Sequence, residues 1–366
     1  MTRGHARPGP WGRLVPRGVG GVPAGRADAP ADDWTALTWA AEARTYVTTT
    51  PDFPLLDIRR WRDGTGDQRY RFACELDVAL RQSGFLLLAG HGVDPGLRAR
   101  IRAAAARFFA LPAGAKDPYA TPVGGRGWIR PGSEANAYYG EVADAARADL
   151  KESLTFGRTF TTGDTDLDRT WFSANVWPAE CPELEALCER YTGEIRALYT
   201  DLLRACAVAF GLPEPWFADR VGASPHTLNI NRYPARAHTG TPLDGQFRVA
   251  PHTDWGVLTI LDRQPGYGGL QVQDRAGRWL DAPYEPNAFT VNVGDLLARW
   301  TGDRWRSTRH RVLPPPAQAP DEELISLIVF LEANVDTVVE PLVAGTAYAP
   351  IVAGTYLLER ANAATV

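Results

Sequence analysis

Two histidines and one aspartate are the residues of this sequence best suited to perform chemistry together. His252 and Asp254 are separated by a single residue, and His310 follows much later in the chain. Two imidazoles and one carboxylate form the ligand set of mononuclear iron(II) oxygenases, which leaves further positions on the metal for oxygen and a cosubstrate. Residues i and i+2 of an extended segment point to the same side, so His252 and Asp254 can hold one ion together. The third ligand must then come from a distant strand.

Strands and turns are predicted between the two parts of this triad. Residues 269–273, followed by Gly277-Arg278-Trp279, are typical of a strand and a tight turn, and residues 291–297 of a second strand that enters a turn. Such elements would carry the chain across a barrel and return His310 to the same end of the barrel as His252 and Asp254. A His-x-Asp triplet alone is weak evidence, because a histidine in a surface turn gives the same pattern.

Composition and charge narrow the class of protein. The chain has 366 residues, of which 45% are hydrophobic, and this is ample for a large core. Its net charge of -4 gives no basic surface for nucleic acid or anionic membranes, and no apolar run reaches the ~18 residues of a membrane span. Cys74, Cys181, Cys188 and Cys206 lack metal-site spacing and are expected to be free thiols in a reducing cytoplasm. We expect a cytoplasmic protein with a small-molecule substrate, and a monomer is the favoured state.

The chain divides by composition into an extension and one domain. Residues 1–49 are rich in Gly, Pro and Arg, lack the apolar centre of a secretory signal, and are expected to be disordered or weakly ordered. Residues 50–366 are expected to form a single oxygenase domain. Within it we assign a flank of helices and loops to 50–225, a jelly-roll core to 226–345 and a C-terminal segment to 346–366.

Hydrophobic periodicity predicts the elements of this domain. Apolar residues recur at helical spacing in residues 70–83 and 97–109, and over a long amphipathic stretch from 182 to Gly211. From residue 228 to about 358, short strands alternate with Gly, Pro and Asp turns, which favours a sandwich or barrel. The expected fold class is α+β with a mostly β core: a jelly roll with a helical N-terminal flank and a long backing helix.

Three aromatic residues are candidates for a substrate pocket. Trp128, Tyr138 and Trp177 fall in or near a long irregular region, residues 113–180, of the kind that often forms a lid or a binding loop. Aromatic side chains more often serve in packing, and the sequence leaves both interpretations open.

The sequence resembles the isopenicillin N synthase-like family of iron(II) and 2-oxoglutarate-dependent oxygenases. The matching blocks follow the family order and are residues 53–58, 84–93, 108–109 and 149–153, Asn231-Arg232-Tyr233-Pro234, residues 269–272, Asn292-Val293-Gly294-Asp295 and His310-Arg311-Val312. The resemblance implies a double-stranded β-helix, the cofactors iron(II), 2-oxoglutarate and dioxygen, and iron held by the triad. It also implies that Tyr233 of the Asn-x-Tyr motif contacts the cosubstrate, with Asn231 as a further candidate.

One position departs from the family pattern. The family has an Arg-x-Ser pair after the His-Arg-Val block, in which the arginine binds the distal carboxylate of 2-oxoglutarate and the serine adds a hydroxyl. Here Ser326 is present and Leu324 stands in place of the arginine. An arginine forms charge-assisted, often bidentate hydrogen bonds to a carboxylate, whereas an aliphatic side chain leaves that charge poorly compensated.

Three explanations of Leu324 are open. In the first, a basic residue from elsewhere substitutes, and Arg248, at the same strand parity as His252, or Arg304 is a candidate. In the second, the enzyme is an oxidase of the isopenicillin N synthase type, which needs no 2-oxo acid. In the third, it uses a different or smaller 2-oxo acid that is held by the metal and Tyr233.

The sequence therefore predicts a non-haem iron(II) oxygenase that oxidises a C–H bond of a natural-product-type small molecule. Hydroxylation, desaturation and ring closure are equally compatible with it. Two other classes compete: a metal hydrolase, for which the Asn-x-Tyr motif has no purpose, and a non-catalytic binding member of the family, which would normally have lost a ligand of the triad.

Overall fold

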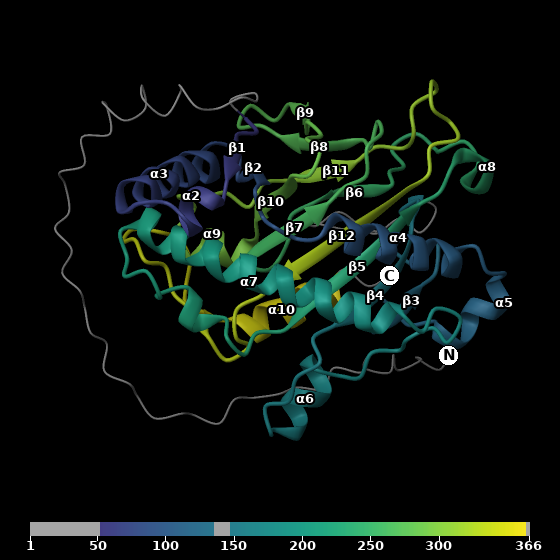
Figure 1. Ribbon diagram of the computed structural model, residues 1–366, viewed down its shortest axis with the longest axis horizontal. Coiled ribbons are helices and arrows are strands. Elements are labelled where there is room, and N and C mark those ends of the chain that lie inside the picture. Colours follow the sequence, from purple (N-terminus) through teal and green to yellow (C-terminus); the bar gives the residue numbers. More distant parts are fainter. Residues whose placement is uncertain (1–51, 135–146, 364–366) are drawn as a thin grey trace, which may run out of the picture. The chain divides into compact units, whose positions relative to one another are not determined.

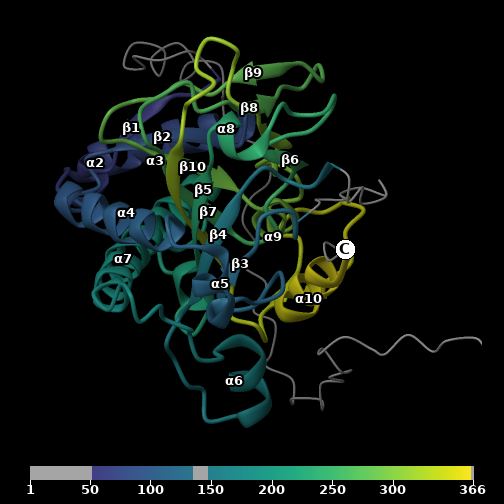
Figure 2. The ribbon, with the colours of Figure 1, turned by 90° about the vertical axis from the view of Figure 1, so that its right-hand side faces the viewer.

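The computed structural model describes residues 52–134 and 147–363. The predicted extension, residues 1–49, and Tyr138 lie outside this described part of the chain. The described residues form three layers: helices cover one face of a large sheet, and a smaller sheet lies against its other face (Figure 1, Figure 2). This arrangement confirms the predicted α+β class and the jelly-roll core with helices behind it.

Three helices dominate the outer layer. They are α3 (Gly66–Gln82), α4 (Pro95–Phe109) and α7 (Leu184–Phe210). The long backing helix α7 ends at Gly211, whose left-handed φ of 82° suits glycine at a helix C-terminus. The shorter helices are α2 (Arg59–Arg62), α5 (Ala113–Lys116), α6 (Thr165–Trp171), α8 (Arg236–Thr239), α9 (Asp295–Trp300) and α10 (Ala353–Ala363).

The large sheet has eight strands in the order β1-β2-β10-β7-β12-β5-β4-β3. All neighbours are antiparallel except β1 and β2. Four strands from the N-terminal half therefore extend the sheet at both of its edges. The strands are β1 (Leu55–Asp57), β2 (Phe85–Ala89), β3 (Gly127–Ile129), β4 (Glu152–Gly157), β5 (His226–Tyr233), β7 (Leu258–Asp262), β10 (Phe289–Val293) and β12 (Leu324–Leu331).

The smaller sheet has the order β6-β11-β8-β9. Its strands are β6 (Val249–His252), β8 (Leu270–Gln273), β9 (Trp279–Asp281) and β11 (His310–Val312). A separate pair is formed by β13 (Val338–Val339) and β14 (Ile351–Val352).

Each strand of the large sheet presents alternate residues to the two layers. In β12, Leu327 and Val329 belong to the main hydrophobic core, which α4 and α7 share. Leu324 points the other way and packs with Tyr233 of β5 and Val249 of β6. The side chains of β12 with even numbers thus face the interior between the two sheets, where a site can be enclosed.

The C-terminus differs from the prediction. Short strands were expected up to about residue 358, but residues 353–363 form helix α10. Tyr356 and Leu357 bury one side of this helix, and good helix formers such as Leu, Glu, Arg and Ala follow Gly354. A short apolar run does not by itself distinguish a buried strand from a buried helix.

Two further expectations concern the class of protein. All four cysteines are free, as predicted. Among the described residues, no helix combines the length and the apolar character needed to cross a membrane.

A buried ion cluster joins the helical layer to the large sheet. Arg98 and Arg102 of α4 lie 3.0 and 2.8 Å from the two carboxylate oxygens of Asp262, at the end of β7. The Asp262 side chain is only 2% exposed. Removing one partner from such a cluster leaves buried charge without compensation, which costs more than the intact pair contributes.

We expect Asp262→Ala to lower the free energy of unfolding by roughly 3 kcal/mol or more, because two buried guanidinium groups lose their counter-ion. Denaturant titration followed by circular dichroism measures this. The control is Asp166→Ala, which removes an exposed pair with Arg169 and should cost less than about 1 kcal/mol. Equal, small losses in the two variants would show that the cluster does not hold α4 to the sheet.

Candidate metal centre

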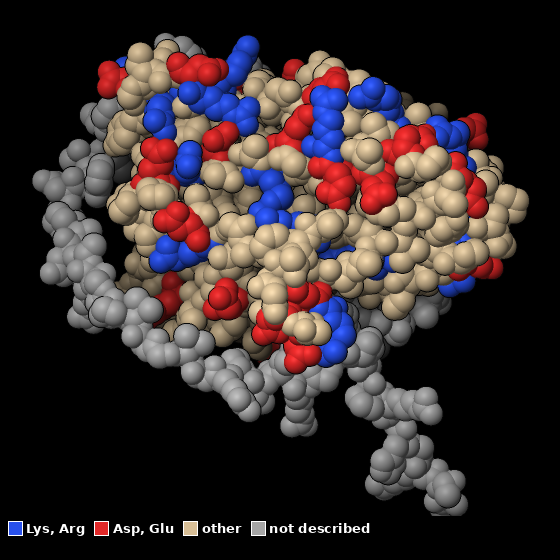
Figure 3. Space-filling view, turned by 60° about the horizontal axis from the view of Figure 1, so that its bottom comes forward, with Lys and Arg blue, Asp and Glu red and all other residues tan. Residues whose placement is uncertain are grey.

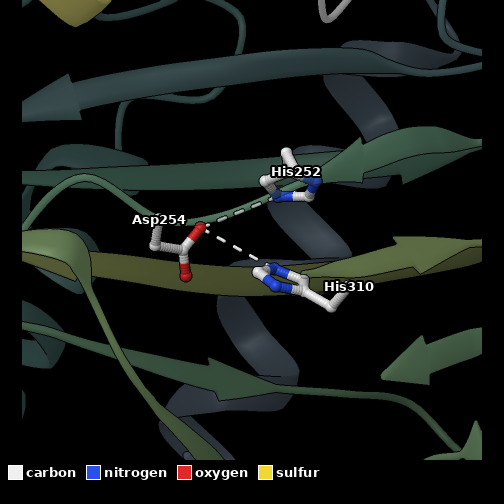
Figure 4. Close-up of side chains that lie close together, drawn as sticks. All are labelled: His252, Asp254 and His310. Atoms are coloured by element: carbon white, nitrogen blue, oxygen red, sulfur yellow. Dashed lines mark ion pairs between the residues drawn. The ribbon is translucent and has the colours of Figure 1, made fainter. Parts of the chain in front are cut away.

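The side chains of His252, Asp254 and His310 converge on one point between the two sheets (Figure 4). The Nε2 atoms of His252 and His310 lie 3.6 and 3.7 Å from Oδ1 of Asp254. One ligand atom from each residue lies within 4.8 Å of the others. Three potential ligands that are distant in sequence therefore share one small volume.

Strand pairing brings the two histidines together. His252 is the last residue of β6 and pairs directly with His310, the first residue of β11. Asp254 lies two residues beyond the end of β6, so the expected single extended segment does not include it. Its loop is held instead by the backbone, because the N–H of Asp295 donates to the carbonyl of Asp254 at 2.7 Å.

Both imidazoles have one nitrogen engaged and the other directed at the carboxylate. Nδ1 of His252 lies 2.8 Å from the carbonyl of Ala250, and Nδ1 of His310 lies 3.1 Å from the carbonyl of Thr308. Since a carbonyl only accepts, each Nδ1 carries a proton, and the lone pair of a neutral ring then lies on Nε2. Burial lowers the pKa of His252 to about 3, which favours the neutral, ligating form. The phenyl ring of Phe85 stands edge-on at 5.3 Å from the ring of His310.

The carboxylate of Asp254 is fixed through its second oxygen. Oδ2 accepts hydrogen bonds of 2.6 Å from the Thr259 hydroxyl and the Asn292 amide. Burial opposes its ionisation, but the two imidazoles and these two donors hold the pKa of Asp254 below its usual value. Oδ1 is therefore left to face the histidines as an ionised ligand.

Thr259 and Asn292 were not among the predicted site residues. They lie on β7 and β10, on the face of the large sheet that is turned toward the smaller sheet. Asn292 belongs to the Asn-Val-Gly-Asp block, so a sequence signal for it exists. The role of Thr259 depends on which strand lies beside Asp254, and the sequence does not contain that information.

The predicted cosubstrate residues form one continuous wall. Ser326 of β12 pairs with Asn231 of β5, and Leu324 pairs with Tyr233. The Asn231 amide oxygen accepts a 2.8 Å hydrogen bond from the hydroxyl of Ser153, and its nitrogen lies 3.4 Å from the Tyr233 hydroxyl. Tyr233, Asn231 and Ser326 thus lie together on the face that is turned toward the smaller sheet.

The two arginines considered as substitutes at position 324 have different surroundings. Arg248 is 1% exposed and its guanidinium carbon lies 5.6 Å from the centre of the Tyr233 ring. Arg304 is instead bonded to Asp77 of α3 at 2.9 Å, on the helical side of the molecule. Arg304 is therefore excluded from this wall, and Arg248 lies next to it.

Two of the predicted pocket aromatics face away from the triad. Trp128 pairs with Leu154 and belongs to the main core under the helices, where its Nε1 donates to Glu152 at 2.8 Å. Trp177 stacks on Phe156 at 3.9 Å and also packs against that core. Both serve in packing on the helical side, so the pocket interpretation is wrong for them. Tyr138 lies outside the described residues.

Lys151 and Asp149 are two buried ionisable residues beside this wall that were not among the predicted site residues. Lys151 precedes β4 and is ion-paired with Glu134, with its Nζ 3.4 Å from the Ser153 hydroxyl. Asp149 accepts a 3.0 Å hydrogen bond from the N–H of Ala250 on β6, and burial raises its pKa to about 7. These residues belong to the block at 149–153, which was recognised only as a resemblance.

The donor set fits a divalent iron ion. Two imidazole nitrogens and one carboxylate oxygen are directed at a shared point, and each side chain is oriented by a hydrogen bond at its other polar atom. Beside these ligands the fold places a wall of polar groups suited to a cosubstrate, which a metal hydrolase would not need.

Sequence families agree with this geometry. Residues 53–180 match the family described as non-haem dioxygenase in morphine synthesis, N-terminal, and residues 225–333 match the 2OG-Fe(II) oxygenase superfamily. The second match contains all three residues of the triad.

Named relatives cover most of the chain. Validamycin A dioxygenase of Streptomyces hygroscopicus subsp. limoneus is 38% identical over 81% of this chain and 80% of its own length. Proline hydroxylase buaE of Petromyces alliaceus is 34% identical over 71% of this chain and 80% of its length. Homoarginine-6-hydroxylase 2-ODD-C23 of Glycine max is 31% identical over 73% of this chain and 79% of its own length.

Solved structures share the fold. A full-length protein of Neurospora crassa, solved in complex with alpha-KG, has a TM-score of 0.75 and 29% identity, covering 86% of this chain and 98% of its own. The rice dioxygenase for auxin oxidation has a TM-score of 0.63 and 26% identity, covering 85% of this chain and 95% of its own. Together with the triad, these similarities establish that the chain belongs to the 2OG-Fe(II) oxygenase superfamily, whose enzymes use iron(II), 2-oxoglutarate and dioxygen.

Proposed function

We propose that this enzyme is a 2-oxoglutarate-dependent dioxygenase in which His252, Asp254 and His310 hold the iron. The observation that carries the proposal is the convergence of three oriented ligand atoms within 4.8 Å of one another. The reaction we propose oxidises one C–H bond of a small polar molecule of the natural-product type. The names of hydroxylases among the relatives favour hydroxylation over desaturation or ring closure.

When bound, iron(II) supplies the redox chemistry by which dioxygen is activated for attack on a C–H bond. The protein holds the ligands in place for this. His252 and His310 offer their Nε2 atoms, Asp254 contributes the one negative charge, and the hydrogen bonds from Thr259 and Asn292 prevent its carboxylate from rotating. For hydroxylation, one oxygen atom of O2 enters the product and the other enters succinate as 2-oxoglutarate loses CO2.

Tyr233, Ser326 and Asn231 orient the cosubstrate in this proposal. Their side chains lie on adjacent strands β5 and β12 and face the smaller sheet, which carries both histidines. A hydroxyl and a phenol on one wall can both donate to a carboxylate. The hydrogen bonds among Ser153, Asn231 and Tyr233 fix the rotamers of this wall.

A polar substrate is supported by the inner face of β4 and β5. Thr155 and Asn229 are paired across these strands. Within the described residues, the Thr155 hydroxyl and the Asn229 amide oxygen are buried without a hydrogen-bond partner. Buried polar atoms of this kind are costly unless something satisfies them. Hydroxyl or amino groups of a substrate would do so, and the relatives named for validamycin A, proline and homoarginine point to the same class.

We further propose that residues 50–366 act as one oxygenase domain, as a cytoplasmic monomer without a nucleic-acid partner. The net charge of -4 supports the last point. On the face shown in Figure 3, basic and acidic side chains are interspersed rather than gathered into a field of one sign. Nucleic-acid binding normally requires a basic patch.

The first prediction from this proposed function concerns the metal. His310→Ala is expected to weaken iron(II) binding by more than ~100-fold, since loss of a ligand should exceed the 10–100-fold cost of losing an outer partner. Anaerobic titration with iron(II), followed by metal analysis, measures this. His238→Ala, at an exposed histidine of α8, is the matched control and should retain the metal. Full iron uptake by the His310 variant would show that the triad is misassigned.

The second prediction concerns the cosubstrate. The iron(II) protein should develop the visible charge-transfer band of a chelated 2-oxo acid when 2-oxoglutarate is added without oxygen, and should form succinate once oxygen is admitted. Absence of both at millimolar 2-oxoglutarate, with iron bound, would reject this function in favour of an oxidase of the isopenicillin N synthase type.

The third prediction concerns the substrate. Small molecules rich in hydroxyl and amino groups should accelerate succinate formation, and apolar molecules should not. Asn229→Leu is expected to reduce that acceleration by about tenfold, the value of roughly one hydrogen bond, with unchanged affinity for 2-oxoglutarate. Acceleration by apolar compounds alone would contradict the proposed substrate class.

A further inference from the structure

The wall that faces the cosubstrate has an apolar position where the family has a cation. Leu324 is 8% exposed and packs with Tyr233 and Val249, while Val312 of β11 packs against the same cluster. No atom of Leu324 can pair with a carboxylate. If a dicarboxylic cosubstrate lies along this wall, its distal charge must be met by another residue.

Arg248 lies at the place where such a residue is needed. It directly precedes β6, and its N–H donates to the carbonyl of Val312 at 2.9 Å, which continues the pairing with β11. His252 ends the same strand four residues later. A regular strand would place the two Cα atoms about 13 Å apart, and the register shift in the pairing of β6 with β11 bends this interval. An extended arginine side chain and a metal-bound five-carbon dicarboxylate can fill that interval together.

The guanidinium of Arg248 is buried but incompletely bonded. Nη2 donates a hydrogen bond of 3.0 Å to the carbonyl of Glu322, whereas Nη1 has two long contacts of 3.5 Å, to the carbonyl of Gly268 and to Oε2 of Glu322. Nε has no hydrogen-bond partner among the described residues. A guanidinium offers five N–H donors, and a side chain 1% exposed cannot complete them with bulk water. Such a deficit calls for an additional acceptor.

The counter-ion of Arg248 contacts only part of its guanidinium group. Glu322 lies 3.5 Å from Nη1 through Oε2, and its Oε1 accepts from the N–H of Gly268 at 3.1 Å. The carboxylate of Glu322 is thus held by the backbone and touches the guanidinium at one corner only. Nε thus has no hydrogen-bond partner among the described residues, and the guanidinium carbon lies 5.6 Å from the centre of the Tyr233 ring.

Lys151, the other buried cation near this wall, is already neutralised. Its Nζ is ion-paired with Glu134, and its second contact is the Ser153 hydroxyl. Asp149, two residues earlier, adds a further acidic group. The positive charge of Arg248 is therefore less fully compensated than that of Lys151, and Arg248 is the better candidate to bind an anion.

We propose that Arg248 binds the distal carboxylate of 2-oxoglutarate, and that it replaces an arginine at position 324 with one at the start of β6. This inference rests on the proposed function. It makes Arg248 a determinant of cosubstrate selectivity, because 2-oxo acids without a distal carboxylate gain nothing from it.

Equilibrium binding without oxygen tests this. The dissociation constants of 2-oxoglutarate and of 2-oxopentanoate, which lacks the distal carboxylate, are measured by calorimetry on iron(II)-loaded protein. The native protein should prefer 2-oxoglutarate by roughly 10- to 100-fold, the range of a hydrogen bond to a charged group. Arg248→Met should abolish that preference without changing iron uptake. Arg248→Gln, which keeps a donor for the Glu322 carbonyl, should do the same if the Met variant fails to fold.

A second variant separates a binding role from a structural one. Arg248→Met combined with Leu324→Arg should recover most of the preference, because the cation returns to the wall from β12. A purely structural arginine would not be rescued in this way. Arg304→Met is the control and should bind both acids as the native protein does, because Arg304 contacts Asp77 elsewhere.

The outcomes are distinct. Unchanged preference in folded Arg248 variants would overturn the inference and leave the proposed function intact, as would a loss seen only in Lys151→Met. Absence of 2-oxoglutarate binding by the native, iron-loaded protein would instead overturn the proposed function itself.

Discussion

The buried carboxylate of Asp254 is the constraint on which the arrangement of the site depends. An ionised carboxylate away from water requires compensation on both oxygens. Thr259 and Asn292 bond one oxygen, and the two imidazoles face the other. The first pair lies on the large sheet and the histidines lie on the small one. The two sheets must therefore pack at one particular register before the site exists.

That packing follows from the two faces of the large sheet. On the helical face, alternate residues of each strand are apolar and join the core under α3, α4 and α7. On the other face, β4, β5 and β12 carry Ser153, Asn231, Tyr233 and Ser326 instead. The hydrophobic effect thus drives one face into the helical layer, and the face that carries these polar residues is turned toward the histidines. A shift of one residue in the pairing of a strand would exchange the side chains on its two faces. The strand register that buries the apolar core therefore also fixes the positions of the site residues.

The sequence predicted the parts of this structure that depend on local pattern. The 3.6-residue period predicted α7 to its end at Gly211, and the resemblance identified the strand blocks and the triad. Trp128 and Trp177 were misplaced because an aromatic residue does not reveal which face of a sheet it occupies until its strand is paired. The contact of Thr259 with Asp254 depends on strand order in the same way, since β7 and β6 belong to different sheets. Arg304 was near His310 in sequence, yet its partner is on α3.

The proposed role of Arg248 would mean that the cation moved from one strand to another while the function was kept. Leu324 on β12 packs with Tyr233, and Arg248 at the start of β6 lies over the ring of the same tyrosine. The proposed iron and cosubstrate sites are tested most directly by diffraction at the iron absorption edge, from crystals grown without oxygen in the presence of iron(II) and 2-oxoglutarate. We expect an anomalous peak between the Nε2 atoms of His252 and His310 and Oδ1 of Asp254, with the distal carboxylate of 2-oxoglutarate against Arg248. A peak elsewhere, or no iron at the triad, would contradict the proposed iron site.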